Sequence, residues 1–225
     1  MEDTDNKQAV GYAFLEIPEV EKYFADLNTK LLAGRHVQSD DYYLFLTLEE
    51  YGLQFAFFYE RLYNLKLNYG LHDGVKYYYL DFFDAGKGKA MDISRYRALT
   101  ELQTVIGLML INMYYAKYFQ NPKIITWSDI RKEIQFGDLK EKYQKILFDE
   151  VKEEYIGSEW SNVEKNFKNT INSFHELGWV KKQFQQSEEI KFEIMASIHR
   201  LAELYKEEID NFAVFTEKIS NWKEE

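Results

Sequence analysis

The sequence predicts a mainly α-helical fold with small β wings (α+β), arranged as two winged-helix domains in tandem. The first observation is chain length: 225 residues, 46% of them hydrophobic, are enough for two small domains with a core each. The second is an order of elements that occurs twice, namely a helix, a short strand, two helices and a two-stranded wing. The third is a segment rich in glycine and charge, DAGKGKAMD at 84–92, which separates the two copies as a linker would.

The first copy opens with apolar residues at helical spacing over 20–32, and Gly34 is placed to end this helix. A short strand is expected at 35–37, between this helix and the next helical pattern. That pattern predicts a second helix over 40–46.

The rest of the first copy predicts a third helix and a hairpin. Thr47 and Glu50 have the spacing of a capping box, which predicts that the third helix begins at this point. Apolar residues then alternate over 65–79, interrupted by Asp73 and Gly74, the residues that favour a tight turn. This pattern predicts the first wing.

The second copy opens with a helix over 96–119 that is apolar on nearly every face, which indicates a buried central helix. A β-branched strand follows at 124–126, and Thr126 and Asp129 have the spacing to cap the next helix. A charged stretch follows at 137–157, to which no helix or strand is assigned.

The strongest helical pattern covers 161–177, where Ser161 and Glu164 have capping-box spacing and Gly178 is placed to end the helix. Its apolar residues form one stripe: Val163, Phe167, Thr170, Ile171, Phe174 and Leu177. The period then changes to two over 179–194, which predicts the second wing. The expected organisation is an N-terminal domain at 1–84, a linker at 85–94, a second domain at 95–195 and C-terminal helices at 196–225.

Composition and motifs give no support for an enzyme, a metal site or a cofactor. The chain has no cysteine, which excludes disulfides, Cys-based zinc sites and thiol nucleophiles. Its four histidines lie far apart in the sequence, and the GKGK run at 86–89 lacks the first glycine and the Ser or Thr of a phosphate-binding loop. An active site assembled from distant carboxylates remains an alternative, and it would require a deep pocket.

Two features predict a cytoplasmic protein without a membrane segment. The first ten residues are polar and acidic, unlike a signal peptide. The most apolar run, 105–113, is much shorter than the ~20 residues of a membrane span.

The charge distribution allows a local nucleic-acid surface in the middle of the chain. The net charge is −10, yet residues 121–182 carry 11 basic and 11 acidic side chains. Six basic residues on the predicted helices and second wing are candidates for DNA contact: Arg131, Lys132, Lys165, Lys168, Lys181 and Lys182. The helix at 161–177 has no arginine, so we expect weak, salt-sensitive contact with phosphates rather than base readout. An ordinary solvated face and a winged-helix transcriptional regulator are the alternatives.

Several short motifs, in order, resemble the MukE/MksE family. LAGRHV at 32–37 looks like the family's "SGRHI" signature, YNLKL at 63–67 like its "YNVxL" strand, and KYYYL at 76–80 like its "GFFYL" strand. The aromatic helix at 51–63, the apolar helix at 98–115 and FHELGWV at 174–180 also look like family segments. The similarity spans roughly 15–208.

The resemblance implies a kite protein of a bacterial condensin. Such a tandem winged-helix subunit dimerises and binds a MukF/MksF-like kleisin, which bridges the heads of a MukB/MksB-like SMC ATPase. It has no catalytic activity, is associated with the nucleoid, and acts in chromosome organisation or plasmid defence. We expect the N-terminal domain to form the dimer, with four aromatic residues as candidates for the dimer or partner interface: Tyr51, Phe58, Tyr77 and Tyr79.

Overall fold

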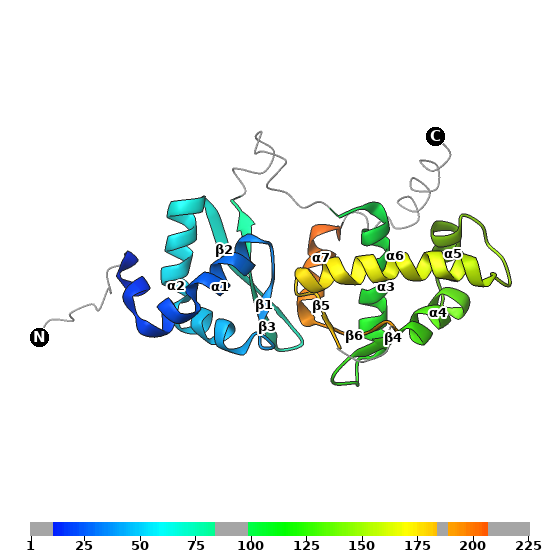
Figure 1. Ribbon diagram of the computed structural model, residues 1–225, viewed down its shortest axis with the longest axis horizontal. Helices are drawn as coiled ribbons and strands as arrows, with labels where there is room; N and C mark the ends of the chain where they lie inside the picture. The colour runs from blue at the N-terminus through cyan, green and yellow to red at the C-terminus, as the bar shows by residue number, and fades with distance from the viewer. Residues whose placement is uncertain (1–10, 84–98, 184–188, 207–225) are drawn as a thin grey trace, which may run out of the picture. The chain divides into compact units, whose positions relative to one another are not determined.

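The computed structural model describes residues 11–83, 99–183 and 189–206 (Figure 1). The chain divides into two compact units, Met1–Arg97 and Ala98–Glu225, which we call unit 1 and unit 2. Each unit consists mainly of helices with one small antiparallel sheet, so the predicted mainly helical α+β class is confirmed. The predicted linker at 85–94, the tip of the second wing and the last predicted helix lie outside the described residues.

Unit 1 has the order helix, strand, helix, hairpin. Its elements are η1 (Tyr12–Glu16), α1 (Pro18–Leu32), β1 (Val37–Gln38), α2 (Tyr42–Tyr63), β2 (Leu65–His72) and β3 (Val75–Phe82). The strands form an antiparallel sheet in the order β1-β3-β2. Asp73 and Gly74 join β2 to β3 with φ values of 49° and 75°, the left-handed conformation that a two-residue hairpin turn needs, so the predicted hairpin is confirmed.

The prediction of two helices separated at Leu46 and Thr47 is wrong, because α2 runs through this point. Thr47 is not a cap: its hydroxyl donates to the Tyr43 carbonyl 2.8 Å away, one turn earlier in the same helix. The interruption lies instead at Tyr51, whose φ and ψ of −113° and 20° kink the helix. The capping-box spacing therefore predicted the helix break at the wrong residue. A threonine inside a helix can donate its hydroxyl hydrogen bond to a carbonyl of the preceding turn, so its presence does not require a helix start.

The core of unit 1 is built largely from aromatic residues. Phe55, Phe58 and Tyr59 project from one face of α2 towards Leu27 and Leu31 of α1. The Phe24 ring of α1 packs edge-on against Phe58, with 5.2 Å between the ring centroids. β3 adds Tyr78 to this core, whereas its neighbours Tyr77 and Tyr79 point to the other face of the sheet.

Unit 2 repeats the order and adds helices. Its elements are α3 (Glu101–Ala116), β4 (Ile124–Thr126), α4 (Trp127–Phe136), α5 (Lys140–Phe148), α6 (Gly157–Glu176), β5 (Val180–Lys182), β6 (Lys191–Ile194), η4 (Ala196–Ile198) and α7 (His199–Leu204). The sheet order β4-β6-β5 matches that of unit 1, since in both sheets the first strand pairs with the last. The predicted cap of α4 by Thr126 and Asp129 is confirmed. The predicted end of α6 at Gly178 is also confirmed, because Gly178 has the left-handed φ of 76° that is typical of a helix end.

Two predictions for unit 2 need correction. The stretch 137–157 contains helix α5, which its high charge concealed because only Tyr143, Gln144 and Ile146 are buried. Helix α6 begins at Gly157 rather than at Ser161, and the Ser161 hydroxyl donates to the Gly157 carbonyl 2.9 Å away. The start of α6 is capped instead by Glu159, whose carboxylate accepts from the Ile156 N–H at 2.8 Å.

Helix α3 is the centre of unit 2, as its apolar sequence predicted. It is buried on nearly every face and packs against α6 and α7. Gly107 permits the close approach of α7, because a Cβ atom at this position would lie 2.7 Å from the Leu201 Cδ2 atom. The helix that follows the second hairpin is therefore part of the unit 2 core.

Replacing Asp129 by Asn should destabilise unit 2 by about 1 kcal/mol at pH 7, the usual cost of weakening a helix cap. Burial alone would raise the pKa of Asp129, but hydrogen bonds from Thr126 and the Lys117 ammonium group 3.3 Å away hold it below its ordinary value. A carboxyl group with a depressed pKa stabilises the fold above its unfolded-state pKa of about 4 and loses this contribution as the pH falls through the folded-state pKa. Urea unfolding should therefore show a smaller difference between wild type and Asp129→Asn at pH 3 than at pH 7. An undiminished difference at pH 3 would contradict a role for the charge.

Candidate functional site

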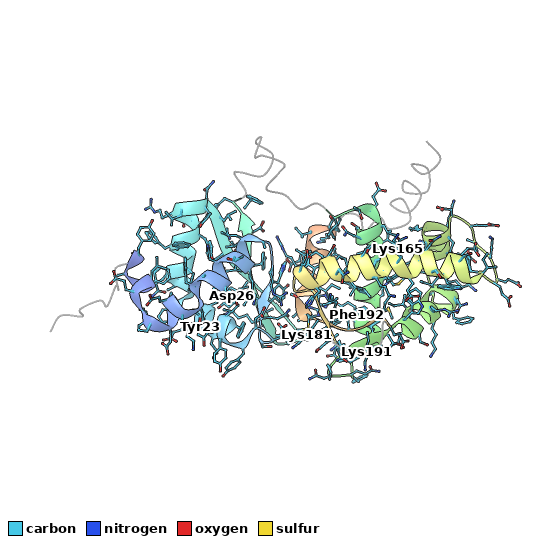
Figure 2. The ribbon with its side chains drawn as sticks, viewed as in Figure 1. Tyr23, Asp26, Lys165, Lys181, Lys191 and Phe192 are labelled. Atoms are coloured by element: carbon cyan, nitrogen blue, oxygen red, sulfur yellow. The ribbon has the colours of Figure 1, made fainter. Side chains whose placement is uncertain are left out.

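The exposed face of α6 carries lysine and asparagine opposite a buried apolar stripe. The stripe contains the predicted residues Val163, Phe167, Thr170, Ile171, Phe174 and, at the end of the helix, Leu177. Lys165 lies on the opposite side and is exposed (Figure 2). Lys168 is half-buried at the flank, where its ammonium group lies 2.8 Å from the Glu164 carboxylate. The charge of Lys168 is thus partly neutralised within the helix.

The second hairpin adds three lysines next to the C-terminal half of α6. Lys181 is exposed on β5, directly opposite Glu193 of β6 in the strand register. Lys182 donates to the Asn172 side-chain oxygen on α6 at 2.9 Å. Lys191 of β6, which is not among the residues predicted from the sequence, lies on the adjacent strand (Figure 2). Strand alternation could have identified Lys191, because its neighbour Phe192 faces the core.

Helix α4 contributes Arg131 and Lys132, both exposed. The Arg131 guanidinium lies over the Trp160 ring near the start of α6, 4.7 Å from the ring centroid. The basic groups are thus divided between two sides of α6, because Arg131 lies beside Trp160 of the buried stripe and Lys165 lies on the opposite, exposed side. Acidic Glu164 and Glu193 are interspersed among them, so this surface has the chemistry for a few phosphate contacts rather than a continuous basic groove.

The face of the unit 1 sheet that lies opposite Tyr78 carries aromatic side chains. The rings of Tyr77 and Tyr79 lie 6.1 Å apart, and His36 contacts the Tyr79 ring at 5.2 Å. The Tyr77 ring covers Gly70 on β2, where a Cβ atom would collide with it. Tyr77 and Tyr79 are 1% and 8% exposed, yet the core of unit 1 takes Tyr78 and not these two side chains from β3. Both side chains are thus buried within the single chain, on the face of the sheet opposite Tyr78.

The other two aromatic candidates have different environments. Phe58 is 4% exposed and belongs to the core of unit 1, because the apolar stripe of α2 turns it towards α1. Phe58, a candidate for the dimer or partner interface, is thus a core residue of the single chain. Tyr51 is half-buried at the kink of α2 and remains accessible at the surface.

A hollow of about 360 Å³ lies in unit 2 between the ends of α3, α5 and α6. Its lining includes Glu101, Phe148, Asp149 and Glu159. The backbone N–H of Ile156, together with Lys152, holds the pKa of Glu159 below its ordinary value, so this carboxylate is an ionised helix cap. Within the described ranges, no group of three or more His, Asp or Glu residues is arranged to hold a metal ion.

The comparison with protein families assigns residues 22–206 to MksE, described as condensin complex protein MksE. The chain belongs to the MksE family. The matched range begins in α1 and ends just after α7, so it includes both units and both hairpins. Among curated proteins, the search finds no significant match.

Membership of the MksE family identifies the chain as a protein of the condensin-complex kind. MksE is not a known enzyme family. The resemblance seen in the short sequence motifs is thereby confirmed. In the part of the chain that the structure describes, no helix combines the length and apolar character needed to cross a bilayer.

Proposed function

We propose that this MksE-family chain is the non-catalytic kite subunit of a bacterial SMC condensin-like complex. It dimerises, binds the complex's MukF/MksF-like kleisin and so regulates the MukB/MksB-like SMC ATPase and DNA loading, in chromosome organisation or plasmid defence. It acts in the cytoplasm, on the nucleoid. The observation that carries this proposal is the family match, which runs through both structural units.

The topology of each unit supports a tandem winged-helix architecture. A winged-helix domain has a helix, a short strand, further helices and a hairpin whose last strand pairs with the first. Unit 2 has this order, and unit 1 has it with the single kinked helix α2 in place of the further helices. Both sheets place the last strand between the other two. In this interpretation α6 and the β5–β6 hairpin occupy the positions of a recognition helix and a wing.

Co-purification tests the proposed function directly. A tagged full-length chain, expressed at its native level, should recover a coiled-coil SMC ATPase and a kleisin at moderate salt, identified by mass spectrometry. An untagged strain gives the background. Recovery of neither protein, together with enrichment of the chain at a few promoters, would contradict the condensin role and indicate a winged-helix regulator.

Tyr77→Asp or Tyr79→Asp should convert a dimer into monomers, because a carboxylate buried without a partner would disrupt the face of the unit 1 sheet on which we place the dimer interface. Size-exclusion chromatography with light scattering measures the mass directly. Tyr118→Asp makes the same chemical change at an exposed tyrosine of unit 2 and should leave the mass unchanged. Circular dichroism must show that each variant is folded. Folded Tyr77→Asp and Tyr79→Asp variants that stay dimeric would place the interface elsewhere.

A further inference from the structure

A groove in unit 1 has the composition of a peptide-binding site. It has a volume of about 390 Å³ and lies between α1 and the first half of α2. Its lining is rich in tyrosine and acid: Glu19, Lys22, Tyr23, Tyr42, Tyr43, Leu46, Thr47, Glu50 and Tyr51. Tyr23 and Tyr51 also pack against the core of unit 1, whereas Tyr42 and Tyr43 do not belong to it.

The floor of the groove is a pair of stacked rings that joins the two helices. Tyr23 of α1 and Tyr43 of α2 are nearly parallel, with an interplanar angle of 8° and a centroid separation of 5.4 Å. Tyr42 packs edge-on against Tyr43, at 5.4 Å and 75°. Tyr43 is nevertheless 61% exposed, and Tyr42 and Leu46 are exposed beside it. The stacked pair is therefore held in place while much of its apolar surface remains open.

The two helices that form the groove are fixed relative to each other. The Asp41 carboxylate, at the start of α2, lies 2.9 Å from the Arg35 guanidinium and 3.2 Å from the Lys30 ammonium group of α1. Burial alone would raise the pKa of Asp41, but these two cations hold it below its ordinary value, so the link is ionised. A groove with fixed walls loses little entropy when it binds a ligand.

The charges of the groove favour a cation at one end. Glu19 and Glu50 line the groove together with Tyr51, the residue at the kink of α2. Both carboxylates raise the pKa of Tyr51, Glu50 through a hydrogen bond and Glu19 through its charge. Lys22, at 5.0 Å over the Tyr23 ring, shows that a ring of this groove accepts an ammonium group on its face. Aromatic faces beside two carboxylates form a complementary environment for lysine or arginine.

We propose that this groove binds an extended segment of the kleisin in which a lysine or arginine is flanked by apolar residues. The basic side chain lies between Glu19 and Glu50, and the apolar side chains cover Tyr42, Tyr43 and Leu46. The inference rests on the proposed function, because it takes the partner to be the kleisin of the same complex. It adds the location of the contact and the chemistry of the segment.

Photo-crosslinking in the reconstituted complex tests the groove. A benzophenone amino acid at position 42 should crosslink to one kleisin segment containing a lysine or arginine, whereas the same probe at position 118 in unit 2 should not. Crosslinks from position 42 to a second copy of the chain or to the ATPase would overturn the assignment.

Charge exchange gives an independent measurement on the full-length chain. The double substitution Glu19→Lys and Glu50→Lys should weaken kleisin binding at least tenfold, and changing the crosslinked basic residue of the kleisin to Glu should restore it. Glu21→Lys with Glu60→Lys, on exposed residues of the same two helices that do not line the groove, changes the net charge equally and should have little effect. Wild-type affinity in the groove variant would overturn the groove and leave the proposed function intact. A wild-type chain that binds no kleisin would overturn both.

Discussion

Phe167→Ala should destabilise unit 2 by about 3–5 kcal/mol, the cost of truncating a fully buried phenylalanine. Phe167 is 0% exposed on the inner face of α6, and its ring contacts that of Trp127 at 5.8 Å. Helix α6 is held to α3 and α4 through this stripe, so the cavity would lie at the centre of the unit. A loss of this size is a large part of the total stability of a small domain.

Tryptophan fluorescence during urea unfolding measures this effect selectively. All four tryptophans lie at or beyond position 127, within unit 2. The midpoint of the fluorescence transition should fall, while its slope should stay near the wild-type value. Phe119→Ala makes the same chemical change at a side chain that is 97% exposed, and it should shift the stability by no more than about 0.5 kcal/mol. Equal midpoints for the two variants would contradict a central role for the α6 stripe.

Strong periodicity in the sequence predicted much of the fold. The apolar stripe of α6 and the mostly apolar α3 could be predicted directly, because burial requires apolar residues at helical spacing. The hairpin at Asp73 and Gly74 could also be predicted, because two left-handed residues in succession require such residue types.

Local capping signals were less reliable than periodicity. Thr47 and Ser161 have the spacing of capping residues, yet both hydroxyls donate to carbonyl groups one turn earlier in a continuous helix. The two structures are alternatives for the same side chain, and tertiary packing decides between them. Helix α5 could not be recognised, since its few buried residues are spread among charges.

The candidate interfaces depended on information that the sequence does not contain. Spacing along a helix indicates which residues share a face, and it placed Lys165 opposite the core correctly. It could not show that Lys168 is paired with Glu164 or that Arg131 lies over Trp160. The tyrosine groove was missed because it joins residues of α1 and α2 that become neighbours only in the folded unit.

Charge reversal on α6 and its hairpin should weaken DNA binding in a graded manner. Lys165→Glu and Lys181→Glu should each lower the affinity for duplex DNA about 3- to 10-fold at low salt, because each replaces an exposed cation near the phosphates by an anion. Lys168→Glu should have the smallest effect of the three, since Glu164 already neutralises part of the Lys168 charge. The slope of log affinity against log salt should become shallower by about one for each phosphate that the variant no longer binds.

Fluorescence anisotropy with a labelled duplex at several salt concentrations distinguishes this local surface from the overall charge of the protein. Lys145 is exposed on α5, so Lys145→Glu changes the net charge by the same amount and is the matched control. Weak contact with phosphates also predicts equal affinity for unrelated duplex sequences, because α6 has no arginine to read guanine. If Lys165→Glu, Lys181→Glu and Lys145→Glu all bind as the wild type does, α6 is not a DNA-contacting surface. Its asparagine and lysine side chains would then be a solvated face, and the contribution of this chain to a condensin complex would consist of protein contacts alone.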